Sequence, residues 1–151
     1  MRGAMGVRRM PFRGWVGRGL RTLLRELPWA HARMAAALGA REVEITVDGE
    51  VVAVESDGER VWLRDEPGAP SVTLRTTRRE IVALAEAERS LVSSVLLGET
   101  VLRGRVDDLA AFHDGLLEFL RGAVRSPSFP GLMDAFRREV VSSDAEREAA
   151  S

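Results

Sequence analysis

The chain has 151 residues, close to the length of one domain, with a net charge of −1, 45% hydrophobic residues and 30% charged residues, as in globular proteins. It has no cysteine, which excludes disulfides, thiolate metal sites and cysteine nucleophiles. No uninterrupted apolar run approaches the roughly 18 residues that indicate a membrane-spanning helix.

The start of the chain is basic. Residues 1–41 contain nine arginines and one acid, Glu26, whereas residues 42–151 contain 13 arginines and 22 acids. Arginines interrupt any apolar core that a secretory signal would need. We therefore expect a basic N-terminal extension over residues 1–28 on an acidic domain over residues 29–141. Residues 1–11 are predicted to be disordered, and the protein is predicted to be cytoplasmic, with a peripheral membrane association as an option.

Two helices are predicted next. Apolar residues recur at steps of three and four, which predicts an amphipathic helix over residues 12–27, at Phe12, Trp15, Val16, Leu20, Leu23, Leu24 and Leu27. Pro28 ends it, and residues 29–38 favour a second helix that Gly39 closes.

The first helix suggests a docking element. A basic amphipathic stretch with aromatic residues can lie on an anionic membrane or bind an acidic partner protein. The residues expected to make this contact are Phe12, Arg13, Trp15, Arg18, Arg21 and Trp29. In the alternative interpretation, the helix packs on the domain and its arginines are solvated. The acidic domain argues against nucleic acid as a partner.

A β-rich region follows. β-Branched residues alternate with polar ones, and Asp48-Gly49 and Asp57-Gly58 are typical of tight hairpin turns. The pattern predicts strands over residues 42–47, 50–56, 59–64 and 71–76.

The remaining elements alternate helix and strand. Thr77 and Glu80 have the spacing of a capping box, which predicts a helix start. A second short helix should bury Leu91, Val92, Val95 and Leu96. A strand over 99–106, a helix over 108–124, a last helix over 132–141 and a frayed tail over 142–151 are expected after it. A strand meander followed by helices predicts an α+β fold, with a mostly antiparallel five-stranded sheet covered by helices on one face.

Two stretches resemble the sterol carrier protein family, the non-specific lipid-transfer fold. SVTLRTTRREIVAL, from Ser71, resembles the family's strand followed by a helix. GETVLRGRVDDLAAF resembles its glycine, strand, glycine and helix, with Gly98 and Gly104 at the positions of the paired glycines. The chain departs from the family at Arg105, where an acidic or amide residue is common. The resemblance extends over residues 29–140.

The resemblance implies an apolar cavity that holds a lipid, an acyl chain or a polycyclic isoprenoid-like molecule without a cofactor or catalysis. The side chains expected to line it are Leu74, Val95, Leu102, Phe112, Leu116, Leu132, Met133 and Phe136. Such residues at helical spacing are equally consistent with an ordinary core. The alternative function is an interaction or scaffold protein that binds no ligand and docks through residues 12–29.

Catalytic and metal sites find no support in the sequence. Ser93, Ser94, His113 and Asp114 supply the residue types of a hydrolase triad, but adjacent residues on a helix do not face each other. The two histidines lack a metal-binding spacing. The paired Asp107 and Asp108 are interpreted as helix-start residues, with Asp107 as the N-cap and Asp108 in the first turn.

Overall fold

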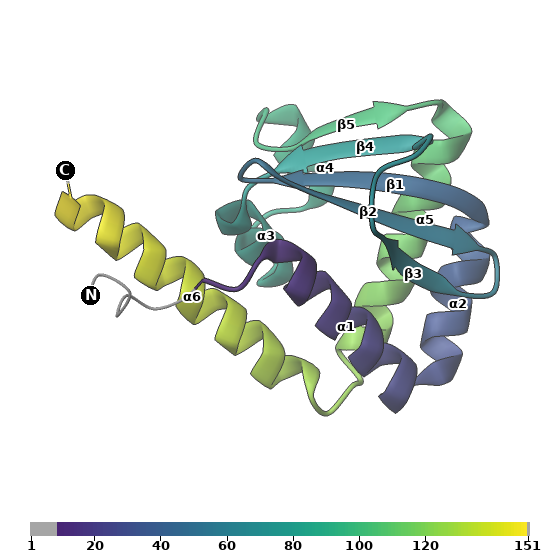
Figure 1. Cartoon of the computed structure of the whole chain (residues 1–151), viewed down its shortest axis with the longest axis horizontal. Coiled ribbons are helices and arrows are strands. Elements are labelled where there is room, and N and C mark those ends of the chain that lie inside the picture. The colour runs from purple at the N-terminus through teal and green to yellow at the C-terminus, as the bar shows by residue number, and fades with distance from the viewer. Residues whose placement is uncertain (1–8, 151) are drawn as a thin grey trace.

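The computed structural model describes residues 9–150 (Figure 1). Of the disorder predicted for residues 1–11, the part over residues 1–8 lies outside the described residues, and residues 9–11 are held by contacts of Arg9 with Asp48 and of the Met10 carbonyl with Arg78. In chain order its elements are α1 (Phe12–Glu26), α2 (Pro28–Leu38), β1 (Ala40–Val47), β2 (Glu50–Asp57), β3 (Val61–Arg64), β4 (Val72–Thr76), α3 (Arg78–Ala85), α4 (Leu91–Leu96), β5 (Val101–Gly104), α5 (Val106–Ala123) and α6 (Phe129–Ala150). None of these helices combines the length and hydrophobicity that crossing a membrane requires.

The five strands form one mixed sheet in the order β3-β2-β1-β4-β5. Three of the pairings are antiparallel, as predicted, but β1 and β4 are parallel. The reason is the connection after β3, which carries the chain back across the sheet to the far side of β1. Glu42 holds this connection, because its carboxylate accepts hydrogen bonds from the backbone N–H groups of Gly68 at 2.7 Å and Ala69 at 3.2 Å.

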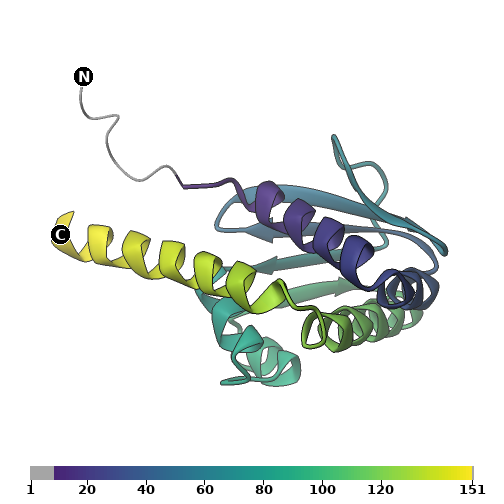
Figure 2. The same cartoon turned by 90° about the horizontal axis from the view of Figure 1, so that it is seen from below.

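Helices α2, α3, α4 and α5 lie on one face of the sheet, α1 runs along its β3 edge, and the connection after β3 crosses the other face (Figures 1 and 2). On the helix side, α2 and α5 pack closely together. Two glycines of α5 allow this approach, because a Cβ atom at Gly115 would lie 2.7 Å from Leu38 and one at Gly122 would lie 2.7 Å from the Cβ of Ala30. The resulting core contains the apolar side chains of β1 and β2 that face α2.

The start of α5 and the end of α6 differ from the prediction. Helix α5 begins at Val106 with Arg105 as its N-cap, so the assignment of Asp107 as the N-cap was wrong. Asp107 and Asp108 both lie in the first turn, and Asp108 accepts a hydrogen bond from Arg41 Nε at 2.8 Å. Helix α6 continues to Ala150, through most of the tail that was predicted to fray. Ion pairs one turn apart, such as Asp134 with Arg138, support it.

Candidate functional site

The helix-facing side of the sheet is covered unevenly. Val43, Val47 and Val52, on β1 and β2, are almost completely buried. Ile45, Leu74 and Leu102 lie in register across β1, β4 and β5, and all three are only partly buried although they face the helices. This row of aliphatic side chains is therefore left incompletely covered.

Helix α5 continues this apolar surface. It packs against β4 and β5, and its Leu109 and Leu116 are likewise partly buried against the core. A Cβ atom at Gly104 of β5 would lie 3.3 Å from Leu109, which places this leucine beside the edge strand. We define the open apolar face as Ile45, Leu74, Leu102, Leu109 and Leu116. The enclosed cavity that the sequence suggested is not shown by the described residues.

The eight residues predicted to bind ligand fall into different environments. Leu74, Leu102 and Leu116 belong to the open apolar face. The others do not belong to it: Leu132 and Met133 are partly buried on α6, Phe112 and Phe136 are buried in the core, and Val95 is exposed on α4. The ring of Phe136 packs edge-on against Phe12 and Trp15. Ile45 and Leu109 were missed, although the strand alternation at Ile45 marked it as inward-facing.

Helix α4 turns its polar side inward, contrary to the prediction. Ser94 is completely buried, and its Oγ donates to the carboxylate of Glu80 at 2.6 Å and lies 2.6 Å from Thr100 Oγ1. Val92 and Leu96, which were expected to be buried, are 63% and 81% exposed. The buried carboxylate decides this orientation, because an ionised group without hydrogen-bond donors is costly to bury.

The pKa of Glu80 reflects the same arrangement. Burial alone would raise the pKa of this carboxyl, but hydrogen bonds from Ser94 and Arg89 outweigh burial, and the pKa is lowered. Thr77 caps α3 by accepting from the backbone N–H of Glu80 at 3.0 Å, as predicted. The other half of the capping box does not form, because the Glu80 carboxylate accepts from Ser94 and Arg89 instead of from the Thr77 N–H. The Glu80 carboxylate, on α3, accepts hydrogen bonds from Ser94 of α4 and from Arg89, and so links α3 to α4.

The residues predicted to dock on a membrane or a partner protein also lie in different environments. Phe12 and Trp15 are buried between α1 and α6. Arg13 donates to the backbone carbonyl of Arg64, while Arg18 and Arg21 are exposed. Trp29 remains 42% exposed. Helix α1 thus directs its aromatic rings into the core and arginines toward solvent, as in the alternative interpretation of this segment, and its docking role stays a prediction.

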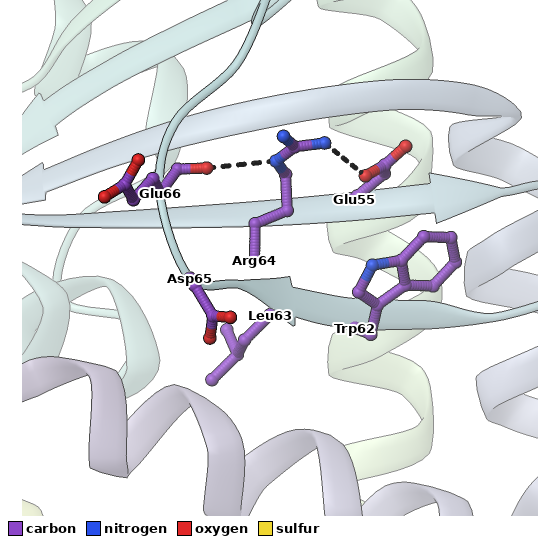
Figure 3. A pocket seen from close by; sticks show the side chains of 6 residues that line it. All are labelled: Glu55, Trp62, Leu63, Arg64, Asp65 and Glu66. Carbon is purple, nitrogen blue, oxygen red and sulfur yellow. Dashed lines mark hydrogen bonds and ion pairs between the residues drawn. The ribbon is translucent and has the colours of Figure 1, made fainter.

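An open hollow of about 680 Å³ lies beside β3 (Figure 3). Its lining consists of Glu55, Trp62, Leu63, Arg64, Asp65 and Glu66. Arg64 donates to Glu55 at 2.7 Å and to the carbonyl of Glu66 at 3.0 Å, and the bond to Glu55 raises the pKa of Arg64. Because three carboxylates surround one arginine that is already paired, this hollow suits neither an anion nor an apolar ligand.

A smaller hollow of about 250 Å³ lies where α3 meets α6. Arg78 in its wall is only 1% exposed and bonds Glu50 at 2.9 Å, Glu139 at 3.0 Å and the carbonyl of Met10 at 2.8 Å. Burial opposes ionisation of Glu50, but bonds from Phe12 N–H and Arg78 lower its pKa. Arg78 therefore joins α3 to β2, α6 and the segment before α1, which is a structural role.

The residues considered for a hydrolase triad are divided between two places in the fold. Ser94 is bonded to Glu80 and Thr100, and the ion-pair partner of His113 is its neighbour Asp114, at 3.8 Å. Across residues 9–150, no group of three or more His, Cys, Asp and Glu side chains is arranged to hold a metal ion.

No family model matches the chain, and no curated protein matches its sequence. Solved structures do match. A UbiJ-SCP2 ubiquinone synthesis protein aligns at 19% identity and a TM-score of 0.53, over 73% of this chain and 96% of its own. Sterol carrier protein 2 from Yarrowia lipolytica aligns at 14% identity and a TM-score of 0.51, over 78% and 97%. The chain has a sterol carrier protein 2-like fold. Protein TT1886 from Thermus thermophilus also matches, with 14% identity, a TM-score of 0.51 and coverage of 80% and 94%.

The two glycines that resembled the family have structural reasons in this fold. Gly98 follows α4 with a φ of 78°, a left-handed conformation that favours glycine. At Gly104 a Cβ atom would lie 2.7 Å from the backbone carbonyl oxygen of Ser71, so only glycine fits where β5 passes β4. Gly98 precedes β5 and Gly104 ends it, and β5 contributes Leu102 to the open apolar face.

Proposed function

We propose that this protein binds an apolar small molecule, such as a lipid, an acyl chain or an isoprenoid-like molecule, against the open apolar face. The observation that carries the proposal is the row of Ile45, Leu74 and Leu102, which faces the helices but stays partly exposed. A ligand that covers such side chains gains roughly 25 cal/mol for each Å² of apolar surface removed from water. No covalent step is needed.

The fold supports the same class of ligand. A sterol carrier protein and a ubiquinone synthesis protein are among its structural neighbours, and both names point to apolar molecules. Leu132 and Met133 on α6 are proposed to complete the site, because methionine adapts its shape to an irregular ligand. Phe112 and Phe136 are proposed to support it from the core behind.

The first test is to identify what the protein carries. Native mass spectrometry of the purified protein, before and after extraction with organic solvent, should show a mass that extraction removes. The extracted protein should then bind a fluorescent fatty acid. A protein that carries nothing and binds neither a fatty acid nor a polyene probe would contradict the proposal.

A pair of neighbouring variants tests the location. Leu102→Trp fills the open apolar face and should weaken probe binding by at least about tenfold, since a large side chain competes for the same space. Val101→Trp is the matched control, because Val101 lies beside Leu102 in β5 but points to the opposite side of the sheet. Equal binding by the two variants would place the ligand elsewhere. Thermal unfolding of both variants checks that they fold.

A further inference from the structure

Trp29, at the start of α2, lies on the surface between two arginines. The guanidinium carbons of Arg33 and Arg125 each lie 5.6 Å from the centre of its ring, one from α2 and the other from just beyond α5. Cation–π contacts of this kind hold an aromatic ring in place without burying it. The structure thus presents a fixed indole ring to solvent, together with two positive charges.

The end of α1 is tied to the same place. Glu26 accepts hydrogen bonds from the hydroxyls of Ser126 and Ser128 and from the Ser128 N–H, at 3.0 Å for the last. These bonds lower the pKa of Glu26 to about 2. The α1–α2 junction and the α5–α6 turn consequently lie at one end of the molecule, along the lower edge in Figure 1. Leu24 and Val124 at this end are 51% and 81% exposed.

The charge at this end is opposite to that of the rest of the chain. Residues 18–33 and 115–128 contain six arginines and two glutamates, in a chain whose net charge is −1. The two glutamates pair with arginines, Glu26 with Arg25 at 3.8 Å and Glu118 with Arg121 at 2.6 Å, and an excess of four arginines remains. This end is therefore electropositive, with exposed apolar side chains among its arginines.

We propose that this end docks on the surface of a bilayer that contains anionic lipids. We name it the basic tip and define it as Leu24, Arg25, Trp29, Arg33, Val124 and Arg125. Arginines attract anionic headgroups, a tryptophan is favoured at the interface, and isolated aliphatic side chains can enter the acyl boundary.

A protein partner fits the basic tip less well. Protein interfaces concentrate their apolar residues in a central patch that is depleted of charge. In the basic tip, by contrast, an arginine adjoins each exposed apolar residue: Arg25 follows Leu24 and Arg125 follows Val124 in sequence, and Arg33 stacks on Trp29. The tip is also separate from the open apolar face, so the inference goes beyond the proposed function and does not depend on it.

The test is co-sedimentation of the full chain with vesicles. Vesicles of phosphatidylglycerol and phosphatidylcholine in equal parts should bind the protein, and vesicles of phosphatidylcholine alone should not. High salt should weaken the binding, because it screens exposed charges. A wild-type protein that does not sediment with the anionic vesicles overturns the proposal.

Variants locate the contact. Arg33→Gln/Arg125→Gln should weaken binding roughly 25-fold, since each arginine near an anionic surface contributes about fivefold. Arg75→Gln/Arg103→Gln is the matched control: it removes the same charge from exposed positions on the face of the sheet opposite to the helices, and it should bind like wild type. Equal losses in both double variants overturn the assignment of the tip.

Tryptophan fluorescence reports insertion directly. Lipids with brominated acyl chains should quench the emission of the bound wild-type protein, and Trp29→Phe should remove most of that quenching. Of the other two tryptophans, Trp15 is buried in the core, and Trp62, although 39% exposed, lies on β3 in the hollow lined by carboxylates, outside the basic tip. Quenching that persists in Trp29→Phe overturns the insertion of Trp29. Circular dichroism establishes that each variant is folded, and all of these readouts are independent of whether an apolar ligand is bound.

Discussion

The helix-facing surface of the sheet is covered to different extents in its two halves, although both halves carry inward-facing aliphatic residues. In the β1–β2 half, the covered side, Val43, Val47 and Val52 are almost completely buried. The α2 helix behind this half packs so closely on α5 that Gly115 and Gly122 have no room for a side chain. In the β4–β5 half, the open side, Val72 is buried, but Leu74 and Leu102 remain partly exposed. We therefore expect the covered side to supply most of the stability, and the open side is the one proposed to bind a ligand.

The largest effect on stability is expected at Arg78, which links α3 to β2 and α6. Arg78 at the start of α3 bonds Glu50 of β2 and Glu139 of α6. Arg78→Met leaves both carboxylates without their buried cation, which should lower the free energy of unfolding by about 3 kcal/mol. Urea denaturation measures it. Arg79→Met is the control, since that side chain is exposed, and it should change stability by less than about 0.5 kcal/mol.

The second-largest effect on stability concerns the hydrogen bond that holds α4 against α3. Ser94→Ala removes the hydroxyl that donates to Glu80, and it should lower the free energy of unfolding by about 2 kcal/mol. It should also raise the pKa of Glu80, because the hydrogen bond from Ser94 no longer offsets the effect of burial. The neighbouring Ser93→Ala, at an exposed position, should stay close to wild type in denaturation. If both serines matter equally, the buried hydroxyl does not anchor α4.

A smaller effect tests the packing of the covered side. A Cβ atom at Gly122 would lie 2.6 Å from Leu23 and 2.7 Å from Ala30, so Gly122→Ala should destabilise the protein by about 1–2 kcal/mol despite the better helix propensity of alanine. Gly131→Ala in α6 meets no neighbour and should be neutral or stabilising. Thermal unfolding compares the two. Stabilisation by both alanines would show that α2 and α5 have room to separate.

The smallest effect concerns Glu26, which adjoins the basic tip, and depends on pH. The pKa of Glu26 is about 2 in the folded protein, against an ordinary value of 4.5. Its ionised form therefore stabilises the folded state above pH 4.5, and this contribution disappears as the pH falls from 4.5 toward 2. Glu26→Gln should unfold at a lower temperature than wild type at neutral pH, and the difference should shrink across that window. A constant difference would exclude a role for its charge.

Much of the architecture was predictable from local sequence signals. Asp48-Gly49 and Asp57-Gly58 marked the turns, steps of three and four marked α1, and Thr77 capped α3 as expected. The paired glycines, Gly98 and Gly104, led to the fold that the solved structures show. These signals succeed because a turn, a cap or a left-handed residue is decided by a few neighbouring residues.

The mixed sheet and the orientation of α4 could not be predicted in that way. Whether β4 lies parallel to β1 depends on where the connection after β3 crosses, which Glu42 fixes from a distant strand. The leucines of α4 were expected to turn inward, but the burial of Glu80 demanded the hydroxyl of Ser94 instead. In both cases a buried carboxylate had to be satisfied by groups remote in sequence.

The sequence by itself determined the elements, their order and the resemblance that gave the fold, because periodicity, turns and caps are local properties. Only the tertiary structure decided which apolar residues stay accessible. Phe12 and Trp15 look as suited to docking as Trp29, yet α6 buries the first two and leaves the third between two arginines. Exposure depends on what packs against a residue, and residues far along the chain supply that packing.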